Sequence, residues 1–388
     1  MTRRLLTWTL RGLAVLLLIA AALAIWKREE ITRLMAVNSL FAADRIVDNF
    51  SHMDRLFLTT PLPRGDGAVS PLPPGLPVDL PPQVAQWITD RSVTALVIVQ
   101  DGLLRHESYY LGTSPDDRRI SWSVAKSLLS ALTGLLLADG TIPSLDIPVT
   151  QAAPQLAGSG YDGVTLHQVL QMTSGVQFNE DYLDFYSDIN RMGRVLALGG
   201  SMNGFAASLA PGAAPPGERM RYVSIDTHVI GMVIEGLTGR PIAELMAERI
   251  IAPMGLEAAP YYLTDGEGTA FVLGGLNMTT RDYARFGAMI AAEGMWHGIR
   301  VLPEDWIALS TAPSAPTAPD APGYGYQWWI PQGYGPSEVL AQGIYGQYIY
   351  INRARDIVIA VNSADRGFEE PGVEAANHAM LQAIAQGL

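Results

Sequence analysis

The chain has 388 residues, 48% of them hydrophobic, which is enough apolar material for one large domain or two closely joined ones. Its net charge of −12 excludes the broad basic face that nucleic-acid binding requires. The absence of cysteine excludes disulfides, thiolate metal sites and a cysteine nucleophile. The six histidines show no HExxH or other close metal-ligand spacing, so we expect neither a metal nor another cofactor.

The N-terminus predicts a secretory signal or a membrane anchor over residues 1–30. An apolar run over residues 12–26 is flanked by basic side chains, which are Arg3, Arg4 and Arg11 before it and Lys27 and Arg28 after it. Residues 22–24, Ala-Leu-Ala, offer a cleavage site, whereas residues 5–10 would lengthen the run toward spanning length. We therefore expect the protein in a bacterial periplasm, either anchored to the inner membrane or released; a buried core helix is the alternative.

Residues 31–83 predict a neck followed by a connector. The connector, residues 61–82, is rich in proline and glycine and has no hydrophobic period, so we expect an extended segment on the surface.

The folded body is expected over residues 84–388, with strands at both of its ends. Residues 92–112 form two strand-like runs around Asp101-Gly102, a strong hairpin signal. Further strand-like and helical runs then follow in chain order, with helices at 120–138, 165–172, 225–239 and 280–294, strands at 324–330, 346–353 and 356–363, and a last helix at 372–386. This order predicts an α/β (α+β) fold in which the first hairpin joins the last strands in one antiparallel sheet, flanked by helices and a mostly helical insert.

Ser123 and Lys126 stand on the apolar helix at 120–138. Of the 26 basic residues only Lys27 and Lys126 are lysine, the basic residue type whose pKa shifts readily on burial. Because the two residues are three positions apart, both side chains lie on one helix face, where a neutral lysine can take the serine proton. The alternative is that Ser123 caps the helix and Lys126 extends to water.

Two further segments predict partners for this pair. Tyr222 precedes the helix at 225–239 and is a candidate proton relay, with Ser224 as the expected N-cap and a possible hydrogen-bond partner in the site. Near the C-terminus, Gly343 interrupts a strand-like run, and the amide of Ile344 is a candidate second oxyanion donor facing that of Ser123. A packed aromatic ring and a simple turn are the alternatives.

These three elements, in this order, resemble the serine β-lactamase-related superfamily, in its class C β-lactamase, D-alanyl-D-alanine peptidase and family VIII esterase branch. The 6-aminohexanoate-dimer hydrolases are the most similar, in the runs SWSVAKS, MTSGVQFNEDY, PGERMRYVSID and GIYGQYIYI. The resemblance covers about residues 84–385. It implies a β-lactamase/transpeptidase-like fold and an acyl-enzyme mechanism, in which Ser123 attacks, Lys126 and Tyr222 move protons, and the amides of Ser123 and Ile344 hold the oxyanion.

The sequence departs from the β-lactamase pattern at two places. Class C β-lactamases have Asn where Ser224 stands, and Lys-Thr-Gly where Gln342, Gly343 and their neighbours stand. Without that lysine, amide or ester substrates are favoured over carboxylate-bearing β-lactams. On a loop expected to overhang the cleft, Tyr182 is a candidate donor to a scissile amide nitrogen, and Asp181 or Asp188 a candidate partner for a substrate ammonium group.

The leading hypothesis is therefore a serine hydrolase of small-molecule amides or esters. A β-lactamase-like or D-Ala-D-Ala carboxypeptidase-like enzyme remains open, as does a catalytically idle, membrane-tethered binding protein on the same scaffold. A Ser-His-Asp hydrolase is disfavoured because Gly-x-Ser-x-Gly does not occur.

Overall fold

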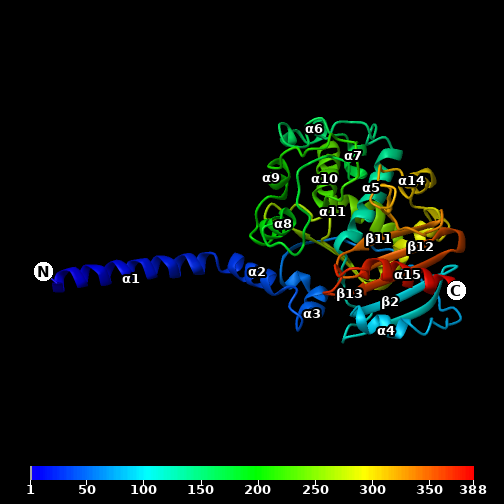
Figure 1. The fold of residues 1–388 in the computed structure, drawn as a ribbon, viewed down its shortest axis with the longest axis horizontal. Helices are drawn as coiled ribbons and strands as arrows, with labels where there is room; N and C mark the ends of the chain where they lie inside the picture. Colours follow the sequence, from blue (N-terminus) through cyan, green and yellow to red (C-terminus); the bar gives the residue numbers. More distant parts are fainter. Residues whose placement is uncertain (1) are drawn as a thin grey trace.

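The computed structural model describes the backbone of residues 2–388 and, from residue 6 onward, the side chains; the predicted basic flank at Arg3 and Arg4 lies outside these described side chains. Helix α1 (Thr2–Trp26) projects away from the rest of the molecule (Figure 1). Its segment Leu6–Trp26 is long and apolar enough to cross a membrane, and none of it is buried in the body. This helix has the length and composition of either predicted element, a signal or an anchor.

The main sheet has seven antiparallel strands in the order β3-β2-β13-β12-β11-β10-β9. These strands are β2 (Val93–Gln100), β3 (Leu103–Tyr109), β9 (Gly323–Tyr324), β10 (Trp329–Ile330), β11 (Glu338–Gly343), β12 (Gln347–Asn352) and β13 (Ile357–Ser363). Strand β2 from the first hairpin pairs with β13 near the C-terminus, so the sheet predicted from the two ends of the body is confirmed. The hairpin turns at Asp101 and Gly102, whose φ angles of 53° and 72° are those of a tight primed turn.

Helices cover both faces of this sheet. On one face, α4 (Val84–Asp90) and α15 (Val373–Gln386) bury Trp87, Leu381 and Ile384 against β2 and β13. On the other face, α13 (Thr280–Ala291) packs against β2, β12 and β13. Gly287 permits this close approach, because a Cβ there would lie 2.4 Å from Val358 Cγ1.

The helical insert stands beside the sheet (Figure 1). Its central helices are α5 (Ala125–Ala138) and α10 (Ser224–Thr238), each ending before a glycine in the left-handed conformation, Gly140 and Gly239. The remaining helices are α6 (Val149–Ala152), α7 (Leu166–Leu170), α8 (Asp188–Ala197), α9 (Met202–Ala207), α11 (Ile242–Met246), α12 (Ala252–Met254) and α14 (Glu304–Ser310). Short 3₁₀ or π turns lie at Trp122–Val124 (η2), Pro154–Leu156 and Ala247–Ile251, and a further 3₁₀ turn at Arg353–Arg355 joins β12 to β13.

A second, four-stranded sheet was not predicted from the sequence. Its strands run in the order β1-β5-β6-β4, and are β1 (Leu58–Pro61), β4 (Arg119–Ile120), β5 (Tyr261–Thr264) and β6 (Leu276–Met278); a separate hairpin joins β7 (Met295–Trp296) and β8 (Ile299–Arg300). Strand β4 leads directly into the segment that carries Ser123, so this small sheet positions the site.

The neck packs into the body. It comprises α2 (Arg28–Ser39), α3 (Ile46–Ser51), a 3₁₀ turn at Met53–Arg55 and strand β1. Leu40, Phe50 and Met53 are each 2% exposed or less and belong to the main hydrophobic core. Residues 28–61 thus contribute to the core instead of only linking the first helix to the body.

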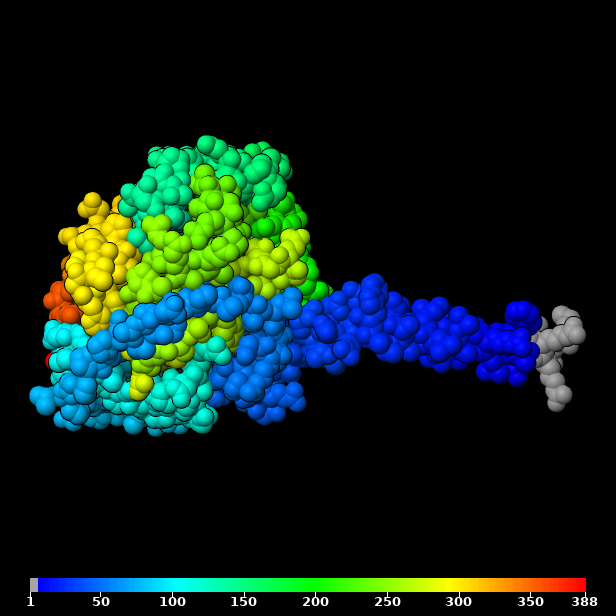
Figure 2. Space-filling view, turned by 180° about the vertical axis from the view of Figure 1, so that it is seen from behind, coloured from blue at the N-terminus to red at the C-terminus, as the bar shows by residue number. Residues whose placement is uncertain are grey.

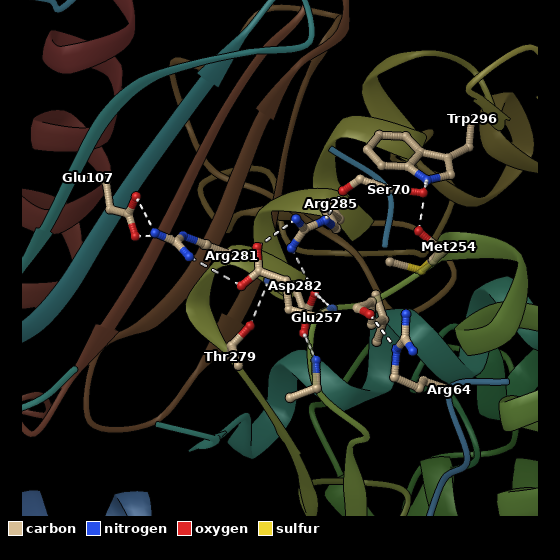
Figure 3. A network of polar contacts seen from close by, with 12 residues as sticks. Arg64, Ser70, Glu107, Met254, Glu257, Thr279, Arg281, Asp282, Arg285 and Trp296 are labelled. Atoms are coloured by element: carbon tan, nitrogen blue, oxygen red, sulfur yellow. Dashed lines mark hydrogen bonds and ion pairs between the residues drawn. The ribbon is translucent and has the colours of Figure 1, made fainter. Parts of the chain in front are cut away.

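The proline-rich connector runs over the surface of the body (Figure 2). A buried network holds it there: Arg285 on α13 donates to the Ser70 carbonyl at 3.0 Å and forms ion pairs with Asp282 and Glu257 at 2.9 and 2.7 Å (Figure 3). In the same network Trp296 Nε1 donates to the Ser70 hydroxyl at 3.1 Å. The connector is therefore held by polar contacts together with Leu62, which is fully buried in the main core.

Candidate active site

Ser123 lies where strand β4 turns into helix α5. The turn passes through η2, and Trp122, directly before the serine, has φ = 43°, in the left-handed region that disfavours a bulky side chain. Strained backbone of this kind is common at functional sites. Ser123 itself caps no helix, since the N-cap residues of η2 and α5 are Ser121 and Val124.

Lys126 is fully enclosed, with only 1% of its surface exposed, so the alternative in which it extends to water is excluded. Its Nζ lies 3.1 Å from Ser123 Oγ and donates to the Leu273 carbonyl at 2.6 Å. Burial lowers the pKa of Lys126 to about 7, and the nearby Glu180 carboxylate offsets part of that effect. At neutral pH a large fraction of the amine is neutral, and its lone pair can accept the proton of the neighbouring hydroxyl.

Tyr222 faces the same pair from the segment just before α10. Its ring stacks on Trp329 with centroids 5.2 Å apart, and Lys126 Nζ lies 5.6 Å from its ring centroid. Burial and the charge of Glu180 raise the pKa of Tyr222, while contacts with the Ser123 and Ser224 hydroxyls offset this in part. The phenol therefore stays protonated at neutral pH, in position to pass a proton on.

Glu180 forms hydrogen bonds with polar groups near Tyr222, and it was not predicted as a site residue from the sequence. It accepts hydrogen bonds from the Tyr182 hydroxyl at 2.6 Å, from the Ser224 amide at 2.9 Å and from the Ser224 hydroxyl. The N-cap role expected for Ser224 is wrong: Val223 is the N-cap of α10, and Ser224 is the first helical residue, with its side chain turned to Glu180. The carboxylate acts as a capping acceptor for the Ser224 amide, which belongs to the first turn of α10, where amides have no acceptor within the helix.

The end of strand β11 lies against Ser123. A Cβ on Gly343 would lie 3.0 Å from the Ser123 backbone nitrogen and 2.7 Å from the Ser121 carbonyl, so only glycine fits there. The next residue, Ile344, lines the same space as Ser123, and Tyr345 after it turns the chain with φ = 60°. This juxtaposition is the one that the predicted Ser123 and Ile344 oxyanion donors require.

Two cavities meet at Ser123. One, of about 310 Å³, is lined mainly by apolar side chains from the neck, α8 and the segment near Leu273. The other, of about 620 Å³, is lined by Tyr222, Trp329 and Gln342 and by three carboxylates, Glu369, Glu370 and Glu374. Ser123, Tyr182, Leu183 and Ile344 line both cavities.

The loop carboxylates proposed as ammonium partners have other contacts. Asp181 is exposed and accepts hydrogen bonds from the Leu183 and Asp184 amides, so it shapes its own loop. Asp188 accepts from the Asn179 amide and forms an ion pair with Arg191 at 3.1 Å. Neither residue is among those that line the two cavities. Within the described residues, no group of three or more His, Asp or Glu side chains could hold a metal ion.

A serine hydroxyl beside a buried, partly neutral lysine and a protonated tyrosine, at the edge of an antiparallel sheet, is an arrangement suited to acyl transfer. The model of the beta-lactamase family matches residues 84–384, so the chain belongs to that family. The named relatives described in the next paragraph are hydrolases, and this chain is a hydrolase with the same fold.

Among the relatives, the 6-aminohexanoate-dimer hydrolase of Paenarthrobacter ureafaciens is 30% identical over 329 residues, covering 80% of this chain and 83% of the relative. A solved structure from Bacillus anthracis, assigned as a 6-aminohexanoate-dimer hydrolase, superposes with a TM-score of 0.76 at 22% identity and covers 89% of this chain and 95% of its own. A D-stereospecific amidohydrolase from Streptomyces superposes with a TM-score of 0.58 at 21% identity, over 79% of this chain and all of its own. The family and fold implied by the sequence are thereby confirmed.

Proposed function

We propose that this protein hydrolyses amide or ester bonds through an acyl-enzyme intermediate, with Ser123, Lys126 and Tyr222 as its catalytic residues. The supporting observation is the 3.1 Å approach of the Lys126 amine to Ser123 Oγ inside a buried site. Because Nζ already donates to the Leu273 carbonyl, the amine is oriented and its lone pair is available to the serine proton.

In the first half-reaction, Ser123 Oγ bonds to the carbonyl carbon while its proton passes to Lys126. The amides of Ser123 and Ile344 stabilise the oxyanion, and the bond to the leaving group breaks as Tyr222 and Lys126 return a proton to it. In the second half-reaction, water attacks the acyl ester by the same proton route in reverse, which releases the acid and restores the serine.

The charge of the larger cavity favours amides or esters over β-lactams. Glu369, Glu370 and Glu374 line it, and the described residues around it include neither lysine nor arginine. A substrate carboxylate would find only repulsion there, whereas a neutral or cationic leaving group would not. One relative is named as a hydrolase of 6-aminohexanoate dimers, which supports an amide as the bond that is cleaved. That dimer also carries a terminal carboxylate, so the preference inferred from charge rests on the cavity lining alone.

A fluorophosphonate probe tests the proposal. We expect covalent labelling at Ser123, found by peptide mass spectrometry, and its loss in Ser123→Ala and in Lys126→Arg, because arginine cannot accept the proton. A panel of a short-chain p-nitrophenyl ester, an aminohexanoate dimer and a chromogenic β-lactam then ranks the substrates, with the β-lactam expected last. Absence of both labelling and turnover would instead support the idle binding protein.

We also propose that α1 remains uncleaved and holds the enzyme at the periplasmic face of a bacterial inner membrane. The support is its apolar length together with the basic residues Lys27 and Arg28 that follow it. Recovery in the membrane fraction with an intact N-terminal sequence is the expected result; a soluble protein that begins after residue 24 would show that the helix is a cleaved signal.

A further inference from the structure

The apolar cavity beside Ser123 is built in part by the neck, outside the segment that the family model matches. Val37, Leu40 and Phe41 line it from one side, and Ile189, Met192 and Leu196 on α8 line it from the other. Its volume of about 310 Å³ lies at the lower end of the range of small-molecule pockets.

The neck wall is firmly held against the site. Phe41 stacks on Tyr345 with centroids 4.7 Å apart and lies 5.9 Å from the Trp122 ring, so it contacts the residues next to Ile344 and Ser123. Arg33 on α2 donates to the Ala197 carbonyl at the end of α8 at 3.0 Å. The neck and α8 therefore form two fixed sides of one pocket.

The outer part of this pocket carries exposed apolar side chains, with Arg194 over the Phe185 ring. Leu183 and Phe185 line it and are 78% and 57% exposed. Val37 on α2 lies only about 16 Å of helix beyond Trp26, the last residue of the candidate membrane span. Exposed apolar side chains around a cavity commonly mark a site for an apolar ligand.

The position of the proton donor decides which part of a substrate enters which cavity. Tyr222 lines the larger, acidic cavity and is absent from the lining of the apolar one. Because a leaving group must take its proton as the bond breaks, it lies on the side of Tyr222. The acyl portion then extends from Ser123 into the apolar cavity.

We propose that the substrates are esters or amides of medium- to long-chain fatty acids, with the alkyl chain between α2 and α8 and a polar, non-anionic leaving group in the acidic cavity. This inference rests on the proposed function and names its substrate class. Ser123 Oγ forms the bond to the acyl carbon, the amine or alcohol leaves with a proton, and water releases the fatty acid.

The experiment measures kcat/KM for p-nitrophenyl esters from acetate to octanoate, below their aggregation limits. The full chain is held in vesicles of a diether phosphatidylcholine, which has no fatty-acyl ester bond to compete and makes detergent unnecessary. We expect kcat/KM to rise about three- to fourfold with each added methylene until the pocket is full. In Gly193→Phe the ratio of octanoate to acetate kcat/KM should fall at least tenfold. Gly193 lines the pocket on α8, and a Cβ there meets nothing within 4 Å, so the new ring enters open space.

Gly67→Phe is the matched control, because a Cβ at Gly67 also meets nothing within 4 Å and this residue is outside the pocket lining. Its octanoate-to-acetate ratio should equal that of the wild type. Hydrolysis of acetate and octanoate with equal kcat/KM, or an unchanged ratio in Gly193→Phe, would overturn the fatty-acyl assignment while the proposed function stands. Failure to hydrolyse any ester, with no labelling of Ser123, would overturn both.

Discussion

The two cavities that meet at Ser123 differ in their walls, in their polarity and in their access to Tyr222. The smaller one is apolar and is closed by the neck and α8. The larger one carries three carboxylates, contains Tyr222 and is closed by the end of β11 and the loop before α15. A single hydroxyl thus lies between an apolar surface and an acidic one.

This difference determines which end of the substrate would lie in which cavity: the acyl chain in the apolar one and the leaving group in the acidic one. We propose that Ser123 and Lys126 act in the same way on every substrate. Only the acidic cavity contains Tyr222, so only a leaving group on that side can receive a proton from it. The family scaffold supplies Ser123 and Lys126, whereas the neck on one side, and residues 367–372 with Glu374 at the start of α15 on the other, supply the contrast. Specificity therefore depends on segments outside the Ser-x-x-Lys motif.

The largest effect is expected from removing the amine of Lys126, the proposed base. Lys126→Met should lower kcat about 10⁴-fold for every substrate, because Met has a similar shape and no proton acceptor. The fold should remain intact, since this change also removes the cost of enclosing an amine. Turnover is measured with an ester and an amide, and Lys27→Met, at the only other lysine, is the control. If one substrate class kept its rate, the two cavities would not share one catalytic centre.

A smaller effect is expected from Tyr222→Phe, and its dependence on the leaving group would show on which side the leaving group lies. Tyr222→Phe should lower kcat about 10²- to 10³-fold for an amide, whose nitrogen needs a proton, and tenfold or less for a p-nitrophenyl ester, which leaves as an anion. The Phe ring can keep the stacking on Trp329. Steady-state kinetics on both substrates provide the comparison, and equal losses would contradict the placement of the leaving group beside Tyr222.

The charge of the acidic cavity should affect binding more weakly. With Glu369, Glu370 and Glu374 all changed to Gln, KM should fall about three- to tenfold for a leaving group that bears a carboxylate and rise for one that bears an ammonium group. The effect is modest because these carboxylates are exposed and screened. KM values for the two matched substrates at low and high salt would measure it; parallel changes for both would rule out an electrostatic cause.

The smallest expected effect concerns Glu180, between the two tyrosines. Its charge raises the pKa of Lys126, so Glu180→Gln should lower that pKa and move the acid limb of kcat/KM to lower pH by roughly half a unit. Gln can still accept the hydrogen bond from Tyr182. A pH–rate profile of each protein is the measurement, and an upward shift would contradict the assignment of Lys126 as the titrating base.

The sequence predicted the parts of the fold that have strong local signals. Asp101-Gly102 and the strand-like runs near the C-terminus predicted the main sheet, in which β2 pairs with β13. The second sheet escaped prediction because its strands are only two to four residues long, too short to show a period. For the neck the sequence predicted only its place before the connector, whereas the structure buries Ile46, Phe50 and Met53 in the main core.

In the site, spacing alone brought Ser123 and Lys126 together, since i and i+3 share a helix face. Glu180 was missed because its contacts with Ser224 span 44 residues of sequence, and a charged loop residue is ordinarily solvated. Asp181 looked equivalent to it, yet only the fold decides which of two adjacent carboxylates turns inward. The walls of the apolar cavity, from residue 37 to residue 344, could not be assembled without three-dimensional structure.

Whether Lys126 is the base for Ser123 is tested by the pH dependence of the rate at which a fluorophosphonate labels Ser123. The reaction is quenched at set times and the labelled fraction is measured by mass spectrometry. Burial lowers the pKa of Lys126 to about 7, and only the neutral amine accepts a proton. We expect a half-maximal rate near pH 7, a tenfold fall per pH unit well below it, and loss of the reaction in Lys126→Met. A rate that is constant from about pH 5 to pH 9, or labelling that persists in Lys126→Met, would contradict this role of Lys126.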